Sequence, residues 1–477
     1  MMKKKIISVC SIFTAFFLLF SLMPNQASAS NQVDITGGVK NEYDYIEYVF
    51  LSGEPVKFTG ADKNVKVTTK TSKGKQTTNY TYSLKSEAGD TLTRKITYVE
   101  DVKEYSLIGQ TVQNGSVTSA SEVIKINGVT YTLLDYQFSN GLTTDNRPAA
   151  DYYAGNIVAT KTYEKKAGKT IERVVVNISS KNEGYSNYWG ASETQITTQE
   201  IQFADGTVGL VENRLSSNKS KTLNYQENNA SLSSFTGGYV TNSAATMVSQ
   251  YKYNFGEGEE VISTQIDHTP VIQRLPIPKF KDTANHYARE EIERLYSLGI
   301  YEEDLEYFNP DLKMQRYEFT ISVSKAINLR VLEEALPKDT TTRLFSDVSR
   351  YEKDYQYLVA AYNKGIIKGI SATDFDPIGG LTREQAATIL IRALGLEGKL
   401  QDSQVLSKYY DQYYISDYAK TAVIEATKIG LMQGDNYGNF RPYDVLSRAD
   451  AAIVVTRFLQ YLNKDLTENY RDNILFY

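Results

Sequence analysis

Three arginines follow a Phe-x-Pro tripeptide at one fixed distance. Arg316, Arg383 and Arg448 each lie eight residues after the phenylalanine, and successive arginines are 67 and 65 residues apart. Thr382 and Ser447 are good N-cap residues, so we expect the arginine after each of them to begin a helix. A helix N-terminus favours anions, and a guanidinium adds a fork that fits a carboxylate. The pattern therefore predicts anion binding.

The residues around the arginines distinguish the three copies. Gln385 and Asp450 lie three residues after the two caps and can close a capping box. The first copy has Gln315 at the cap position, a poorer cap. We therefore expect the first arginine to contribute least to anion binding. A structural alternative has comparable weight, in which Arg383 pairs with Asp347 and only holds neighbouring segments together.

The chain has few residues of the types that other catalytic or metal-binding sites need. There are two histidines and one cysteine, Cys10, so we expect no Ser-His-Asp triad and no thiolate metal site. The segment DNYGNF (435–440) hints at calcium but lacks EF-hand spacing, and we interpret it as a turn. We expect no cofactor and no metal. Paired carboxylates need not be near in sequence, so a glycosidase site in the first half stays open.

The single tryptophan, Trp189, allows two interpretations. With Tyr185 and Tyr188 it could form a sugar-stacking patch. We favour the alternative, in which this segment is a loop packed on a sheet.

The first 29 residues predict a secretory signal peptide. Lys3–Lys5 precede an apolar stretch, and the small residues Ala27 and Ala29 mark a cleavage site; an uncleaved membrane anchor is the alternative. This leader holds 3 of the 52 basic residues and none of the 57 acidic ones, which leaves 49 basic residues and a net charge of −8. An acidic exported chain argues against nucleic-acid binding, which needs clustered positive charge.

Residues 32–264 have the composition and turns of antiparallel β-structure. Thr, Tyr, Val, Ser and Asn are abundant, and Asn127-Gly128 and Asp205-Gly206 separate strand-like runs, as in hairpins whose turns need positive φ. Segments 66–84 and 162–179 have the same form around a basic, glycine-containing turn. Three of the ten prolines then fall in residues 267–280, which predicts an extended linker. Beyond it, apolar residues recur at helical spacing.

A threefold internal repeat accounts for the recurring arginines. Each copy has an aromatic-x-Asp tripeptide, a Gly-Ile or Gly-Leu pair, the Phe-x-Pro tripeptide and the arginine; the aspartates are Asp282, Asp347 and Asp411. The second and third copies have a further glycine, Gly369 and Gly434. The first copy reads GIYEEDLEYF there and lacks it.

These motifs resemble those of the S-layer homology (SLH) family, whose repeat runs F-x-D-V, an aromatic-Ala pair, G-I-x-x-G, F-x-P and T-R-A-E. The resemblance covers residues 280–465, and nothing in 32–264 resembles a known family. The usual tryptophan of the repeat aligns with Tyr287 in the first copy, Lys353 in the second and Tyr418 in the third.

The resemblance implies both a fold and a partner. SLH triplets form a threefold arrangement whose inter-repeat grooves bind secondary cell-wall polysaccharide, commonly through a ketal-pyruvate group, which is a carboxylate. The residues that it implies for polysaccharide binding are Arg316, Arg383, Arg448, Asp282, Asp347, Asp411, Tyr287, Tyr418, Gly369 and Gly434.

We therefore expect a multidomain chain, with an N-terminal all-β antiparallel region followed by an all-α SLH triplet in a pseudo-threefold arrangement. The expected boundaries are a signal peptide at 1–29, a β-region at 30–266 (one or two domains, with a split near 140–150), a linker at 267–279, repeats at 280–335, 343–397 and 407–465, and a tail at 466–477.

The expected function is non-covalent anchoring of a secreted protein to cell-wall polysaccharide, with the β-region as an outward structural or adhesive module. The expected location is the cell wall or surface layer, with no membrane contact after signal removal, and self-assembly in that layer is open. We expect no enzyme, and the alternative is a wall-anchored polysaccharide hydrolase with its active site in the β-region.

Overall fold

The computed structural model describes residues 37–72, 74–105, 109–226, 238–278, 280–302, 306–329, 343–398 and 408–474. The expected signal peptide, with Cys10, lies outside these ranges. Within them, no helix combines the length and the apolar character that crossing a membrane requires.

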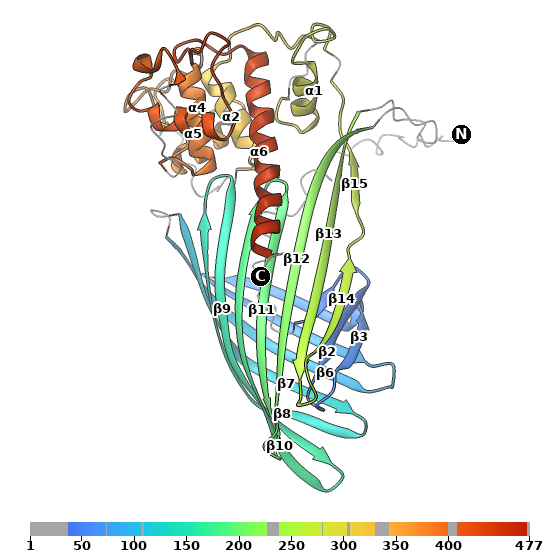
Figure 1. Ribbon diagram of the computed structural model, residues 1–477. Helices are drawn as coiled ribbons and strands as arrows, with labels where there is room; N and C mark the ends of the chain where they lie inside the picture. The colour runs from blue at the N-terminus through green and yellow to red at the C-terminus, as the bar shows by residue number, and fades with distance from the viewer. Residues whose placement is uncertain are drawn as a thin grey trace, which may run out of the picture. The chain divides into compact units, whose positions relative to one another are not determined.

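Most of the first half is one antiparallel sheet of 15 strands (Figure 1). Its order follows the chain from β1 to β3 and from β5 to β14, while β4 pairs with β5 and β15 pairs with β13. The strands are β1 (Val39–Lys40), β2 (Asp44–Val49), β3 (Val56–Ala61), β4 (Val65–Ser72), β5 (Lys75–Lys85), β6 (Thr91–Tyr105), β7 (Gln110–Ile126), β8 (Val129–Asn146), β9 (Ala150–Ala167), β10 (Thr170–Asn187), β11 (Gly190–Gln202), β12 (Val208–Gln226), β13 (Gly238–Asn254), β14 (Glu260–Asp267) and β15 (Val271–Arg274).

The structure confirms the antiparallel β-region and its hairpins. Asn127 and Gly128 both have positive φ, 49° and 78°, in the turn between β7 and β8. At the other predicted turn only Gly206 does, because Asp205 instead accepts the backbone N–H of Thr207. The split near 140–150 is wrong, since β8 and β9 are paired neighbours in the same sheet.

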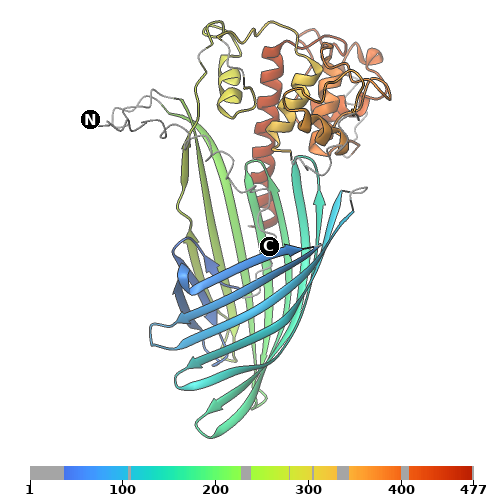
Figure 2. The same cartoon turned by 180° about the vertical axis from the view of Figure 1, so that it is seen from behind.

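The sheet curls until its two ends nearly meet. Strands β2–β7 cross one side of the sheet and β9–β13 the other, as the two opposite views show (Figures 1 and 2). At the seam, the Gly37 carbonyl accepts hydrogen bonds from the Tyr251 hydroxyl on β13 (2.7 Å) and from Asn213 on β12 (3.0 Å), and Asn41 donates to the Asp267 carbonyl (2.9 Å). The first and last strands are therefore linked mainly by side chains.

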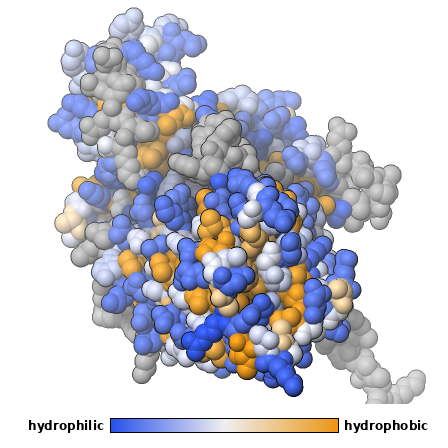
Figure 3. All heavy atoms as spheres, turned by 60° about the horizontal axis from the view of Figure 1, so that its bottom comes forward, coloured by the Kyte–Doolittle hydropathy of each residue, from blue (hydrophilic) through white to orange (hydrophobic). Residues whose placement is uncertain are grey.

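Alternation along the strands fills the inside of the sheet. On β6, for example, Leu92, Arg94, Ile96 and Tyr98 are buried while Thr93 and Lys95 between them are exposed. Outward positions are mixed, and apolar side chains lie between hydrophilic ones on the face drawn in Figure 3. Aliphatic strand side chains that are more than half exposed include Leu134, Val158, Ile171, Leu210 and Val261.

The expected linker is partly strand. Residues 271–274 form β15 and pair with β13, so this part of 267–279 belongs to the sheet. None of the three prolines lies in β15, since Pro270 immediately precedes it and Pro276 and Pro278 follow it.

The second half is helical, as expected. Its helices are α1 (Arg289–Ser297) and α2 (Arg316–Ala326) in repeat one, α3 (Tyr355–Asn363) and α4 (Arg383–Leu394) in repeat two, and the short η4 (Gln412–Tyr414), α5 (Lys420–Lys428) and α6 (Arg448–Ile474) in repeat three. The tail expected at 466–477 is wrong for residues 466–474, which continue α6.

Trp189 is buried against α6 and not exposed to a sugar. Its indole Nε1–H donates to the Leu459 carbonyl at 2.7 Å, and the neighbouring Asn187 donates to the Leu462 carbonyl at the same distance. The segment is packed, as the favoured interpretation had it, although its partner is a helix rather than the sheet.

Candidate functional site

Each recurring arginine is the first residue of its helix. In α4 the Thr382 hydroxyl accepts the N–H of Gln385, whose side chain accepts the Thr382 N–H, so the expected capping box is present. In α6 the Ser447 hydroxyl accepts the N–H of Asp450 at 3.0 Å. Gln315 makes no side-chain cap for α2. The local sequence thus sets the helix starts as predicted.

The first backbone N–H groups of these helices have no acceptor within the helix, and they donate instead to carbonyls of a neighbouring repeat. The N–H groups of Arg383 and Glu384 donate to the carbonyls of Asp444 and Pro442, which belong to repeat three. The same pattern holds for Arg316 and Tyr317 toward repeat two, and for Arg448 and Ala449 toward repeat one. The expectation that these N–H groups bind an anion is therefore wrong, and only the arginine side chains keep that chemistry.

Each arginine side chain contacts the Phe-x-Pro loop of the following repeat. Arg383 Nε donates to the Phe440 carbonyl (2.8 Å) and Arg448 Nε to the Phe308 carbonyl (3.0 Å). The guanidinium carbons of the three arginines lie 4.9, 5.1 and 4.4 Å from the ring centroids of Phe375, Phe440 and Phe308. We name these contacts junction 1–2 (Arg316), junction 2–3 (Arg383) and junction 3–1 (Arg448); they form a closed cycle.

The three aspartates hold the Phe-x-Pro loops of their own repeats. Asp347, for example, accepts the N–H groups of Phe375 (2.9 Å) and Asp376 (2.7 Å). Asp282 and Asp411 make the equivalent pairs of bonds. The central residue of each loop has positive φ, between 57° and 61°, which a non-glycine residue adopts only when held. The alternative is therefore wrong about Asp347 as the partner of Arg383, although Arg383 does contact the neighbouring repeat, as that alternative expected.

The two further glycines do not open the backbone to a ligand. A Cβ on Gly369 would lie 2.4 Å from the Ser371 carbonyl oxygen, and one on Gly434 would lie 2.6 Å from the ring of Tyr409. Atoms of the same repeat fill the space that a side chain would need. These glycines allow each repeat to pack against its own aromatic-x-Asp segment.

The two tyrosines at the tryptophan position reach across junctions. The Tyr287 hydroxyl donates to Asp450 (3.0 Å) at junction 3–1, and the Tyr418 hydroxyl donates to Glu384 (3.0 Å) at junction 2–3. Burial raises the pKa of both hydroxyls, and the neighbouring carboxylates raise it further. At junction 1–2 the corresponding Lys353 instead pairs with Glu302.

The three arginines differ in the number of hydrogen-bond and ion-pair partners of their guanidinium groups. Arg448 forms an ion pair with Glu318, and its side chain is 13% exposed. Arg383 donates to two carbonyls, those of Phe440 and Gln433. Arg316 donates to the Lys368 carbonyl (2.8 Å), but its buried Nε has no partner among the described residues.

Burial lowers the pKa of both Arg316 and Arg383. Neither guanidinium forms an ion pair among the described residues, and only more distant carboxylates, Asp376 for Arg316 and Asp450 for Arg383, offset its loss of water. Among the three arginines, Arg316 has the fewest polar partners within the described residues.

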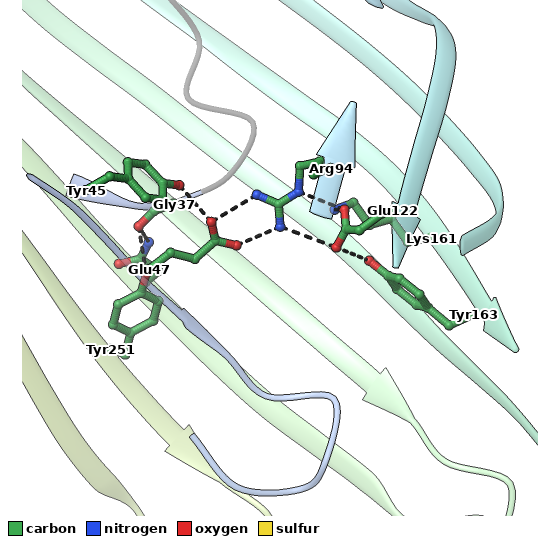
Figure 4. A network of polar contacts seen from close by, with 9 residues as sticks. Gly37, Tyr45, Glu47, Arg94, Glu122, Lys161, Tyr163 and Tyr251 are labelled. Atoms are coloured by element: carbon green, nitrogen blue, oxygen red, sulfur yellow. Dashed lines mark hydrogen bonds and ion pairs between the residues drawn. The ribbon is translucent and has the colours of Figure 1, made fainter. Parts of the chain in front are cut away.

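A second cluster of charges lies inside the sheet (Figure 4). Arg94 on β6 donates to Glu47 on β2 (2.6 Å) and to Glu122 on β7 (2.8 Å). Lys161 and Tyr163 on β9 also donate to Glu122, at 3.2 and 3.1 Å. The charges of two cations and two anions cancel in this network, and its hydrogen bonds link β2 to β9 across the interior.

The electrostatics of the network are those of a structural element. Burial alone would raise the pKa of Glu122, but Arg94 and Lys161 hold it at about 2. The cavity beside the network has a volume of about 70 Å³, far below the roughly 300 Å³ of typical small-molecule pockets. It has room for ordered water and not for a sugar ring. Among the described residues, no group of three or more acidic, histidine or cysteine side chains is placed to hold a metal.

Sequence reasoning missed both the shared junctions and the network. Each junction takes its arginine from one repeat and its loop from the next, and no local motif records which copy follows in space. The network could have been found from the sequence. Arg94, Glu122 and Lys161 alternate with exposed residues and lie on the same face of their strands as buried apolar residues such as Leu92 and Ile124.

Comparisons with known proteins agree with the repeat. A model of the S-layer homology domain matches residues 279–320, 344–387 and 408–452, so the C-terminal part carries three tandem S-layer homology domains. All three matches lie after the sheet.

Similar proteins fall into two groups. Exoglucanase XynX of Acetivibrio thermocellus is 31% identical over 187 residues, which are 39% of this chain and 16% of that protein. An amylopullulanase of Thermoanaerobacterium thermosulfurigenes is 29% identical over 184 residues, 38% of this chain and 9% of that protein. A surface-layer 125 kDa protein of Lysinibacillus sphaericus is 30% identical over 185 residues, 38% and 14% respectively.

The chain thus spans less than a fifth of each of these relatives. The domains indicate cell-wall anchoring. Together with the surface-layer relatives, they point to a secreted protein held at the cell wall on the cell surface.

Proposed function

We propose that the three repeats anchor this protein non-covalently to an anionic secondary cell-wall polysaccharide, and that ketal-pyruvate carboxylates of the polymer bind at the junctions. The repeats are arranged about a pseudo-threefold axis in this proposal. The closed cycle of arginine contacts supports that arrangement, because repeat three returns to repeat one through Arg448 and Phe308.

Junction 1–2 is the main anion site in this proposal. The single observation that carries it is that the Arg316 guanidinium has one carbonyl acceptor and no ion pair among the described residues, whereas Arg383 has two carbonyl acceptors and Arg448 pairs with Glu318. Junction 3–1 contributes least, because Glu318 already neutralises Arg448. This order is the reverse of the one expected from the caps and glycines, because it follows from the partners of the arginine side chains.

The aspartates and glycines act indirectly. Asp282, Asp347 and Asp411 position the loops that the arginines contact, and Gly369 and Gly434 permit the packing of those loops. Tyr287 and Tyr418 line junctions 3–1 and 2–3 with partly exposed rings. We propose them as secondary contacts to the polymer.

Sedimentation of the full chain with purified cell walls tests this function. We expect the wild-type protein to sediment, and walls stripped of pyruvate to retain it poorly. Arg316→Ala should weaken the apparent affinity about tenfold to a hundredfold, the equivalent of one charge-assisted contact. If pyruvate removal leaves sedimentation unchanged, the carboxylate is not the group that is bound.

A second candidate function is a wall-anchored polysaccharide hydrolase. The names of the exoglucanase and amylopullulanase relatives favour it, although the shared part is about as long as the three-domain region alone. Inside the sheet, Glu47 and Glu122 are bound to Arg94. Turnover of wall glycans by the full chain, abolished by one carboxylate substitution in the β-region, would establish this alternative.

A further inference from the structure

Four of the exposed tyrosine side chains of repeat three lie in two short segments. Tyr410, Tyr413 and Tyr414 are 82%, 87% and 67% exposed, and Tyr437 is 76% exposed. Large aromatic rings left in water on one part of a surface mark an interaction site. The second segment is DNYGNF, whose interpretation as a turn is correct: Gly438 N–H donates to the Asp435 carbonyl at 3.1 Å.

The two segments contact each other at Tyr410. The N–H of Tyr410 donates to the Gly438 carbonyl at 2.9 Å. The Tyr410 ring lies directly over Gly438, where a Cβ would come within 2.9 Å of the ring. Tyr410 therefore lies against the turn that carries Tyr437.

Hydrogen bonds hold both segments in place. The Asp435 carboxylate accepts the N–H groups of Tyr437 and Asn439, each at 2.9 Å, and forms an ion pair with Arg441 at 2.7 Å. On the other segment, the Asp411 carbonyl accepts the N–H of Tyr414 at 2.9 Å. The backbone that carries the rings is already ordered, so little further protein chain has to be ordered when a ligand stacks on them.

This surface adjoins junction 2–3. Arg383 donates to the carbonyls of Gln433 and Phe440, which lie immediately before and after the turn that carries Tyr437. A polymer whose carboxylate reaches Arg383 therefore has its neighbouring units next to the tyrosines. Aromatic rings offer an apolar face to the C–H groups of a sugar, and the phenol hydroxyls can bond to sugar hydroxyls.

We propose that Tyr410, Tyr413, Tyr414 and Tyr437 form a stacking surface for sugar rings of the wall polysaccharide, outside the arginine contacts. This inference rests on the function proposed above and extends it to a second kind of contact. Stacking is not screened by salt, whereas the contact at an arginine weakens as ionic strength rises.

Sedimentation of the full chain with purified walls, at low and high salt, tests the surface. We expect Tyr410→Ser with Tyr437→Ser to weaken binding about fivefold at both salt concentrations, as the loss of two stacking contacts would. Tyr410→Trp with Tyr437→Trp keeps the rings and should stay within about twofold of wild type. Tyr43→Ser, which removes a 63% exposed tyrosine from the β-region, is the matched control.

The outcomes separate this inference from the proposed function. If the serine pair binds as wild type does while Arg316→Ala is weakened, the stacking surface is overturned and the anchoring function stands. If the tryptophan pair is as weak as the serine pair, or if the serine pair changes only association between copies, stacking is likewise overturned. If the wild-type protein does not bind walls, both proposals fall.

Discussion

Arg94 and Arg316 are both guanidinium groups withdrawn from water, but their surroundings differ in kind. Arg94, inside the sheet, donates to two carboxylates and is 3% exposed. Arg316, at junction 1–2, has one carbonyl acceptor, one aromatic ring and a buried Nε without a partner among the described residues.

The difference separates a closed network from an open site. A buried ion that is fully paired contributes to one fixed arrangement and has nothing to offer a ligand. A partly buried ion without a counter-charge keeps the attraction that its junction does not use. On the function proposed above, the same kind of side chain is thus structural in the sheet and binds an anion in the repeats.

The largest effect should come from breaking the closed network. Arg94→Ala leaves Glu47 and Glu122 buried without their main partner, which should cost about 3–5 kcal/mol of unfolding free energy. Denaturant unfolding followed by circular dichroism measures it. Lys40→Ala, which removes an exposed pair with Asp62, is the control and should cost less than about 1 kcal/mol. Equal effects of the two substitutions would contradict a structural role for Arg94.

The network should also make the sheet less stable as the pH falls. The pKa of Glu122 is lowered from 4.5 to about 2, so its stabilising contribution is present above pH 4.5 and is lost as the pH falls toward 2. Wild type should therefore be more stable than Glu122→Gln at pH 7, and this advantage should shrink between pH 4.5 and 2. An advantage that is constant over this range would show that the Glu122 charge is not the cause.

Exchanging one residue between junctions should exchange their behaviour. Glu318 in repeat one corresponds to Gln385 in repeat two, since each lies two residues after its arginine. Glu318→Gln frees Arg448 and should raise affinity for pyruvylated polysaccharide, while Gln385→Glu should lower it several-fold by neutralising Arg316. Glutamate can still close the capping box of α4, so the helix start is preserved. If a binding titration shows that Glu318→Gln lowers the affinity and Gln385→Glu raises it, these two positions do not control the charge of the arginines.

The smallest effect concerns the weakest cap. Gln315→Ser gives α2 a hydroxyl cap and should raise the unfolding free energy by about 0.5–1 kcal/mol. Thermal melts compare it with wild type, and wall binding should not change. A loss of stability would mean that the Gln315 side chain makes a contact that serine cannot replace.

How far the sequence predicts this molecule depends on the range of the interaction. Helix starts at Arg383 and Arg448 and the hairpin at Asn127-Gly128 follow from residues within four positions of one another, and they were predicted. The partner of each arginine lies about 60 residues away in the next repeat, or 140 residues back for Arg448. Spacing therefore located the arginines but not the repeat whose loop each one contacts, and the order of importance proposed above differs from the one expected from the caps and glycines.

The sheet shows the same limit. Its strand pairing is almost entirely between chain neighbours and follows from the hairpin signals. The near-closure depends on contacts such as Tyr251 with Gly37, 214 residues apart, which no periodicity encodes.

Calorimetric titration of the full chain with purified, pyruvylated wall polysaccharide tests the central claim most directly. We predict that Arg316→Ala loses about tenfold or more in affinity, while Arg448→Ala loses less than about threefold, because Glu318 already forms an ion pair with that guanidinium. Both variants are compared at a temperature where their melts show them folded. If Arg448→Ala loses more affinity than Arg316→Ala under these conditions, Arg316 is not the main anion-binding residue and junction 1–2 is not the main site.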